Sequence, residues 1–240
     1  MNEILVALDV DSRARALSLA DELRDVVGGF KVGNRLFTSE GPDLVRTLVD
    51  KGCRVFLDLK YHDIPNTVAQ AIEAAVATGV WMVNLHTCGG AAMMQAAARA
   101  GVDTAHRLGT TPPLVIGVTV LTSMNDAALQ EVGVVRPLLE QVVHLAVLAQ
   151  QSGLHGVVAS PLETPAIRRA CGPDFLIVTP GIRGAAAGTE QHDQVRTMGP
   201  AEAVAAGANY LVVGRPIIAA GNPRDAALRI GDELLAHRRS

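Results

Sequence analysis

The sequence predicts an α/β protein with the TIM (β/α)8 barrel fold. Short apolar runs alternate with segments of helical periodicity along the whole chain. Apolar strands that are separated by helices form a parallel sheet, because both faces of such a sheet are covered. Eight strand–helix units in 240 residues match the size of this barrel. No linker or low-complexity segment divides the chain, so we expect one domain over residues 1–240.

The expected elements follow one another in strand–helix order. The eight expected strands lie at residues 4–8, 29–32, 55–59, 81–85, 114–120, 156–159, 176–178 and 210–213. The expected helices lie at residues 12–26, 42–51, 67–78, 91–107, 137–152, 162–170, 201–206 and 223–236. Asp11 or Ser12 is the expected cap of the first helix. Prolines lie near the starts of several later helices, where a missing N–H has no cost.

A doubly wound open sheet is the alternative fold. It would need no eighth strand, and it often carries a glycine-rich turn after the first strand. Here the first strand runs into Leu8-Asp9-Val10-Asp11, which contains no glycine. This difference weakens the dinucleotide-binding interpretation and favours the barrel.

The composition excludes several classes of function. The 21 Lys and Arg against 24 Asp and Glu give a net charge of −3, not the basic surface that nucleic acids require. No apolar run reaches the ~18 residues of a membrane-spanning helix, and the N-terminus is typical of a strand rather than a signal peptide. The cysteines Cys53, Cys88 and Cys171 are widely spaced, so we expect buried thiols rather than disulfides or a zinc site. We therefore expect a cytoplasmic protein that binds neither nucleic acid nor membranes.

Charged residues gather where the expected strands end, which is where barrels of this class place their chemistry. The third strand ends in Asp58-x-Lys60-x-x-Asp63. Residues two apart on a strand point the same way, so Asp58 and Lys60 are expected on the barrel interior. Lys31 on the neighbouring strand could complete a set of alternating charges. The plainer alternative is an ion-pair network that only holds the barrel together. Because buried charges are costly to desolvate, we favour chemistry.

The end of the chain carries a second pattern, which is typical of phosphate binding. Gly181-Ile182-Arg183 follows the seventh strand, and Gly214-Arg215 follows the eighth. The loops after these two strands are the usual phosphate site of the fold, where glycines expose backbone N–H groups and arginine matches the anion. Between them, the small residues 184–189, with Gln194 nearby, suit a lid over the phosphate. An ordinary flexible loop is the alternative.

These motifs closely resemble those of the orotidine 5′-phosphate decarboxylase family. The resemblance is strongest in DLKYHDIPNT at residues 58–67 and extends over nearly the whole chain. It includes ALD at 7–9, FKVG at 30–33, VTVLTS at 118–123, VTPGIR at 178–183 and VGRPI at 213–217. A bare DxKxxD is shared with a wider superfamily, whereas the longer motif, together with Lys31 and Arg215, is far more specific.

The resemblance implies a role for each matching residue. It implies conversion of orotidine 5′-monophosphate to UMP and CO2 without a cofactor or metal, in pyrimidine biosynthesis. Lys60 would be the proton donor, and Asp58 would lie beside the substrate carboxylate. It also implies a homodimer in which Asp63 and Thr67 reach the partner's active site. The remaining residues would bind substrate: Asp9 and Lys31 the ribose, with Lys31 also in the charge network, Thr122 the pyrimidine, and Arg183, Gln194, Gly214 and Arg215 the 5′-phosphate.

Three other functions remain open at this point. Magnesium-dependent sugar-phosphate decarboxylases or aldolases of the same superfamily share DxKxxD, but they typically have an acidic residue where Lys31 stands. A non-catalytic nucleotide-binding barrel would keep the arginines and would not need Asp58, Lys60 and Asp63. Schiff-base chemistry at Lys60 would require a neutral amine, which nearby carboxylates disfavour.

Overall fold

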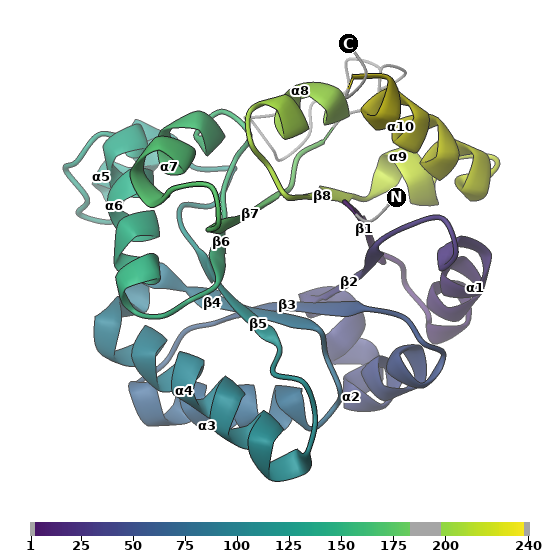
Figure 1. The fold of residues 1–240 in the computed structure, drawn as a ribbon, viewed down its shortest axis with the longest axis horizontal. Helices are drawn as coiled ribbons and strands as arrows, with labels where there is room; N and C mark the ends of the chain where they lie inside the picture. Colours follow the sequence, from purple (N-terminus) through teal and green to yellow (C-terminus); the bar gives the residue numbers. More distant parts are fainter. Residues whose placement is uncertain (1–2, 183–197, 238–240) are drawn as a thin grey trace.

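The computed structural model, which describes residues 3–182 and 198–237, is a closed barrel of eight parallel strands surrounded by helices (Figure 1). The strands follow one another around the barrel in sequence order. The first strand pairs with both the second and the eighth, so the sheet has no edge. The predicted (β/α)8 barrel is confirmed, and the open-sheet alternative is wrong.

The strands correspond closely to those predicted from the apolar runs. The strands are β1 (Ile4–Ala7), β2 (Gly29–Gly33), β3 (Val55–Tyr61), β4 (Met82–His86), β5 (Leu114–Val118), β6 (Gly156–Val158), β7 (Leu176–Thr179) and β8 (Tyr210–Val213). The fifth ends two residues before the predicted boundary at 120, and the third extends beyond 59 to Tyr61. The extension of β3 matters for the site described below.

The helices cover the outside of the barrel. They are α1 (Arg13–Leu23), α2 (Asn34–Asp50), α3 (Pro65–Val76), α4 (Gly90–Leu108), α5 (Asp126–Glu131), α6 (Leu138–Gln151), α7 (Thr164–Cys171), α8 (Pro200–Ala205), α9 (Arg215–Ile218) and α10 (Pro223–His237), with a 3-10 turn η1 (Thr87–Gly89) before α4. Ser12 caps α1 by accepting a hydrogen bond from the Arg15 N–H. The hydroxyl thereby satisfies one of the N–H groups that a helix start leaves unpaired.

Three helical segments were not predicted. The second helix begins at Asn34 rather than at 42, because Gly41 adopts a φ of 67° and joins two helical pieces at a kink before Pro42. The short helices α5 and α9 were also missed. They have six and four residues, too few for a helical period to stand out from the surrounding loop.

The core has two parts, because strand side chains alternate between the two faces of the sheet. Inside the barrel lies a small cluster: Leu5, Ala7, Phe56, Met82, Ile116, Val178 and Val212. The intervening residues, such as Ile4 and Val6 of β1, face outward and pack in the larger core with the helices. Each fully buried side chain of this size contributes ~1.5–3 kcal/mol to stability. The inner cluster fixes which positions point into the barrel at the strand ends.

None of the helices in the described residues is long and apolar enough to cross a membrane. The three cysteines are free thiols. Cys53 and Cys171 are buried as predicted, but Cys88 is exposed in η1, so the prediction of a buried thiol is wrong there. Cys88 is the middle residue of the three-residue turn, in which Thr87 takes the buried position.

Candidate active site

Three charged residues continue the inward-facing rows of the barrel at its C-terminal end. On β1 the inward residues Leu5 and Ala7 are followed, two positions on, by Asp9. The same alternation places Lys31 of β2 and Asp58 of β3, two residues after Phe56, on the inner face. Parallel strands end at the same rim, so these side chains meet although they are far apart in sequence.

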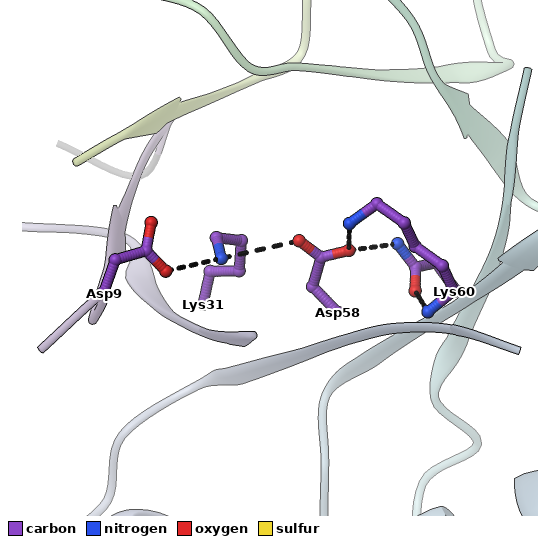
Figure 2. Close-up of polar contacts among 5 residues, drawn as sticks. Asp9, Lys31, Asp58 and Lys60 are labelled. Atoms are coloured by element: carbon purple, nitrogen blue, oxygen red, sulfur yellow. Dashed lines mark hydrogen bonds and ion pairs between the residues drawn. The ribbon is translucent and has the colours of Figure 1, made fainter. Parts of the chain in front are cut away.

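The four charges Asp9, Lys31, Asp58 and Lys60, referred to below as the charge array, alternate in sign (Figure 2). The Lys31 Nζ lies 3.1 Å from Asp9 Oδ1 and 3.5 Å from Asp58 Oδ2. The Lys60 Nζ lies 2.6 Å from Asp58 Oδ1. The Lys31 side chain is 10% exposed and the Lys60 side chain 29% exposed. Lys31 is therefore enclosed by carboxylates, whereas the ammonium of Lys60 is more accessible to a bound molecule.

Asp58 is the centre of the charge array and is buried. Burial alone would raise the pKa of the Asp58 carboxyl, but the positive charges of Lys31 and Lys60 and hydrogen bonds from Lys60 and Asn84 lower it below its ordinary value. Asp58 is thus a carboxylate at neutral pH. A buried carboxylate between two ammonium groups holds both cations in place without neutralising either of them.

Lys60 lies on an irregular part of β3. Its φ of 53° makes it the one residue other than glycine with a positive φ in the described part of the chain. This left-handed conformation costs a residue with a side chain ~1–2 kcal/mol. The register between β3 and β4 shifts here, because Leu57 pairs with Val83 but Tyr61 pairs with Leu85. Such bulges redirect side chains and are common beside active sites.

Asn84, from the middle of β4, is a site residue to which the sequence analysis assigned no role. It is fully buried. Its Nδ2 donates to Asp58 Oδ1 over 2.7 Å, and its Oδ1 accepts from the backbone N–H of Lys60 over 2.8 Å. The signal that could have found it is its alternation with Met82, which places a polar side chain on the inner face of a buried strand.

Asp63 lies between β3 and α3, and Thr67 lies in the first turn of α3. Both are exposed, and the Asp63 Oδ1 accepts a hydrogen bond from the N–H of Ile64. Asp63 forms no ion pair with Lys60 in the part of the chain that the structure describes. The intervening Ile64 is 66% exposed, which is unusual for a large apolar side chain.

The phosphate-binding residues predicted after β7 and β8 are described only in part. Gly214 precedes α9, and a Cβ added to it would lie 3.8 Å from Asp9 Oδ2. The loop after β8 is therefore next to the charge array, with the exposed Arg215 at the first position of α9. Arg183 and Gln194 lie outside the described residues. Thr122 is half-buried in the turn that follows β5.

Two histidines flank the lysine end of the array. The rings of His62 and His86 have centroids 5.7 Å apart. Burial, with the nearby His62 and Lys60, lowers the pKa of His86, so its imidazole is neutral at pH 7. Among the described residues, no group of three or more His, Cys, Asp and Glu side chains is arranged to hold a metal ion.

The fold and site together define a class of protein: a (β/α)8 barrel with alternating carboxylates and ammonium groups at the C-terminal ends of its first strands. The model of the Orotidine 5′-phosphate decarboxylase / HUMPS family matches residues 2–230. The chain belongs to this family.

Individual relatives match over nearly the full length. An orotidine 5′-phosphate decarboxylase from Syntrophotalea carbinolica is 54% identical, covering 98% of this chain and 95% of the relative. One from Moorella thermoacetica is 53% identical, covering 97% and 92%. The crystal structure of orotidine 5′-phosphate decarboxylase from Lactobacillus acidophilus matches with a TM-score of 0.85 and 35% identity, covering 98% of this chain and 99% of that one.

Proposed function

We propose that this enzyme is a carboxy-lyase that converts orotidine 5′-monophosphate to UMP and CO2 in pyrimidine biosynthesis. Family membership and relatives more than 50% identical support the reaction. The observation that carries the mechanism is the Lys60 ammonium, 2.6 Å from a buried carboxylate and partly exposed at the strand ends. We further propose that residues 1–240 form one domain and that the enzyme acts in the cytoplasm.

The reaction requires stabilisation of a localised negative charge. When the bond between C6 and the carboxylate breaks, its electron pair stays on C6 in the plane of the pyrimidine ring. The ring π system cannot delocalise that pair, so the protein must stabilise it electrostatically. Lys60 would supply a positive charge beside C6 and then donate a proton to it, which forms the C6–H bond of UMP. Water returns the proton to the lysine.

Asp58 and Lys31 would keep the proton donor ready. The Asp58 carboxylate accepts a hydrogen bond from the Lys60 ammonium over 2.6 Å and so fixes the position of the donor group. Lys31 contacts the other oxygen of Asp58, so the orientation of the carboxylate is fixed on both sides. Fixed charges of this kind stabilise a transition state without reorganisation at the moment of reaction.

The remaining roles concern substrate binding. Asp9 and Lys31 would bind the ribose hydroxyls, and Thr122 would contact the pyrimidine edge. Arg183, Gln194, Gly214 and Arg215 would bind the 5′-phosphate. The closeness of Gly214 to Asp9 supports this arrangement, because it places the phosphate loop next to the ribose site. Phosphate binding far from C6 can contribute to catalysis if it holds the array closed around the substrate.

We also propose a homodimer with shared sites. Asp63 and Thr67 are exposed, an exposed Ile64 lies between them, and the described residues show no ion pair between Asp63 and Lys60. A second subunit that covers this segment would bury the isoleucine and bring Asp63 to the partner's Lys60. The active site would then contain a fifth charge, and neither subunit would have a complete site alone.

The arrangement also bears on the alternatives. Magnesium-dependent relatives use carboxylates to hold the cation, whereas the Lys31 ammonium lies between Asp9 and Asp58 and would repel it. A Schiff base would require the Lys60 Nζ to give up its 2.6 Å contact with Asp58 Oδ1. A non-catalytic barrel leaves the buried charges unexplained, since apolar residues would stabilise the fold as well. We therefore propose a reaction that needs neither metal nor organic cofactor.

The decisive test is the fall in ultraviolet absorbance of orotidine 5′-monophosphate on addition of the purified protein with excess EDTA. Stoichiometric conversion to UMP is expected. Absence of conversion by a folded protein would exclude the proposed reaction and favour the magnesium-dependent relatives, whose sugar-phosphate substrates would be tried next with the metal restored.

The shared site has its own test. Lys60→Ala and Asp63→Ala chains should each be inactive, because each lacks one member of every site. In a mixed dimer, one of the two sites has both residues intact, so mixing should restore up to about half of the wild-type activity per heterodimer. If subunit exchange is proven by mass spectrometry and no activity returns, Asp63 does not act across the interface.

A further inference from the structure

The register between β3 and β4 shifts at one position. Between the paired positions Leu57–Val83 and Tyr61–Leu85, β4 contributes the single residue Asn84, whereas β3 contributes three residues, from Asp58 to Lys60. A buried strand normally satisfies each N–H on a neighbouring carbonyl. At the bulge, the N–H of Lys60 instead donates to the side-chain Oδ1 of Asn84.

The same carboxamide also fixes the side chain at the start of the bulge. The Nδ2 of Asn84 donates to Asp58 Oδ1, the oxygen that also accepts from the Lys60 ammonium. One fully buried amide thus links the backbone of Lys60 to the carboxylate that its own ammonium contacts. A carboxamide can make both contacts at once, because its nitrogen donates and its oxygen accepts.

We propose that Asn84 is a positioning residue of the active site, which holds Lys60 in its left-handed backbone conformation and sets the orientation of Asp58. The inference rests on the proposed decarboxylation and goes beyond the roles assigned above. Lys60 would not adopt a φ of 53° without a partner for its N–H, and a regular strand at this point would redirect the ammonium. The hydrogen bond to Asp58 also helps to keep the pKa of that carboxyl low.

The proposal predicts a loss of turnover with little loss of substrate binding, because Asn84 supports the groups that act at C6. Asn84→Ala removes both hydrogen bonds, and we expect kcat to fall by about 100-fold, as for a displacement of a reacting group by about 1 Å. KM should change by less than about fivefold. Retention of kcat within threefold of the wild type by a folded Asn84→Ala variant would overturn the proposal.

A second variant separates positioning from mere structural support. Asn84→Asp keeps an acceptor for the Lys60 N–H but faces Asp58 with a second carboxylate. When the introduced carboxyl is protonated it can donate to Asp58 and mimic the amide, and two adjacent carboxyls raise the pKa of one of them. The positive charges of Lys31 and Lys60 oppose that rise. Because the nearby His86 can also titrate, the kcat of the variant is divided by that of the wild type at each pH. The ratio of variant to wild type should rise about tenfold from pH 8 to pH 5.5. A flat ratio overturns the proposal.

Asn209 provides the matched control. Its Oδ1 also accepts a strand N–H, that of Ile177, but it lies before β8 at the other end of the barrel. Asn209→Asp should leave kcat unchanged, with no acid-side recovery. If both Asn84 variants fail to fold while Asn209→Asp folds, the role of Asn84 is structural and the proposal is wrong.

A further readout separates this inference from the proposed reaction. If the wild-type protein converts no orotidine 5′-monophosphate, the reaction is wrong, and the positioning role is judged by the carboxyl ¹³C titration of Asp58, assigned with Asp58→Asn. Asn84→Ala should raise the pKa of Asp58. An unchanged titration would show that the amide does not act on this carboxylate.

Discussion

The two ends of the barrel contain the same kinds of polar side chain, but these side chains have different binding partners. At the N-terminal ends of the strands, Arg168 and Asn209 form what we term the basal clamp. Arg168 donates to four backbone carbonyls and to Asn209 Oδ1, over distances of 2.7–2.9 Å. At the C-terminal ends, the ammonium groups of Lys31 and Lys60 form ion pairs with carboxylates. Both ends contain a carboxamide that accepts a strand N–H.

The difference lies in what each cation is bound to. The guanidinium of Arg168 satisfies carbonyls in the loops that lead into β7 and β8, so its charge secures the chain where the barrel closes. The ammonium groups of the charge array instead share one buried carboxylate, an arrangement that costs desolvation and does not tie separate loops together. The half-buried charge of Arg168 is bound to neutral acceptors, whereas the charges of the array are bound to opposite charges.

The largest expected effect is at the C-terminal end. Lys60→Ala removes the group that we propose as the proton donor and as the charge beside C6, so kcat should fall by at least about 10⁴-fold. The melting temperature should stay within a few degrees, because Asp58 keeps its contact with Lys31. Steady-state absorbance kinetics and circular dichroism measure the two quantities.

The chain supplies a matched control for this variant. It has three lysines, and the one outside the charge array, Lys51, pairs with Asp21 on the surface. Lys51→Ala should leave kcat unchanged. Turnover by a folded Lys60→Ala variant above about 1% of the wild-type rate would contradict the role of Lys60.

The opposite result is expected at the basal clamp. Arg168→Met keeps an apolar stem but leaves several carbonyls unpaired, which should cost ~2–4 kcal/mol of the free energy of unfolding. For a chain of this size the melting temperature would fall by roughly 4–16 °C. The kcat should remain within twofold of the wild type, because the Arg168 guanidinium is bound at the N-terminal ends of the strands, opposite the array.

The neighbouring Arg169 allows a control on the same helix, since it is exposed at the end of α7. Arg169→Met should change the melting temperature by no more than about 1 °C, as for surface substitutions in general. If Arg168→Met lost kcat without losing stability, the basal clamp would not have the purely structural role that distinguishes it from the charge array.

The sequence was sufficient for most of the fold and for part of the site. All eight strands were predicted, because continuously apolar runs bounded by helices leave few alternatives. The approach of Asp58, Lys60 and Lys31 was also predicted, from the period of two along a strand and the common rim of parallel strands. These rules are local and depend only on spacing.

The features that were missed depend on pairing between strands. Asp58 and Lys60 do meet, but through a bulge rather than by the regular alternation assumed, since Lys60 has a positive φ. Nothing in the propensity of lysine indicates that conformation; it is stabilised by Asn84, 24 residues further along the chain. The contribution of Asp63 and Thr67 across a dimer interface stays a prediction, because it concerns contacts between two chains.

A smaller effect is expected from a glycine beside the array. A Cβ added to Gly33 would lie 2.8 Å from the Lys31 Nζ, so alanine would displace the ammonium from between its carboxylates. The φ of −99° at Gly33 suits alanine, and the change should cost less than ~1 kcal/mol of stability. We expect kcat/KM to fall by about 10- to 100-fold.

Gly221 serves as the control, because an added Cβ there meets no atom within 4 Å. Gly221→Ala should therefore leave kcat/KM unchanged. If Gly33→Ala is as active as Gly221→Ala, the position of the Lys31 ammonium does not limit the reaction, and the enclosure of Lys31 by carboxylates has only a structural meaning.

The smallest expected effect is on the acid limb of the stability curve. The pKa of Asp58 is lowered in the folded protein, so its carboxylate stabilises the fold above the unfolded pKa of about 3.9, and this contribution is lost as the pH falls toward the folded value. Asp58→Asn lacks the contribution. Between pH 5 and pH 3, the melting temperature of the wild type should therefore fall by a few degrees more than that of Asp58→Asn.

Salt separates this buried carboxylate from one on the surface. The hydrogen bond and charge of Arg224 lower the pKa of Asp25 to about 2, so Asp25 gives a similar acid dependence. The Asp25 side chain is 61% exposed and that of Asp58 is 12% exposed. At 1 M salt the screening length is about 3 Å, which weakens the exposed pair and leaves the buried one nearly intact. Salt should therefore suppress the contribution of Asp25 to the acid dependence, which Asp25→Asn measures. It should leave the contribution of Asp58, which Asp58→Asn measures, nearly unchanged. Equal suppression of both would mean that solvent reaches the charge array freely, which is incompatible with electrostatic stabilisation at C6.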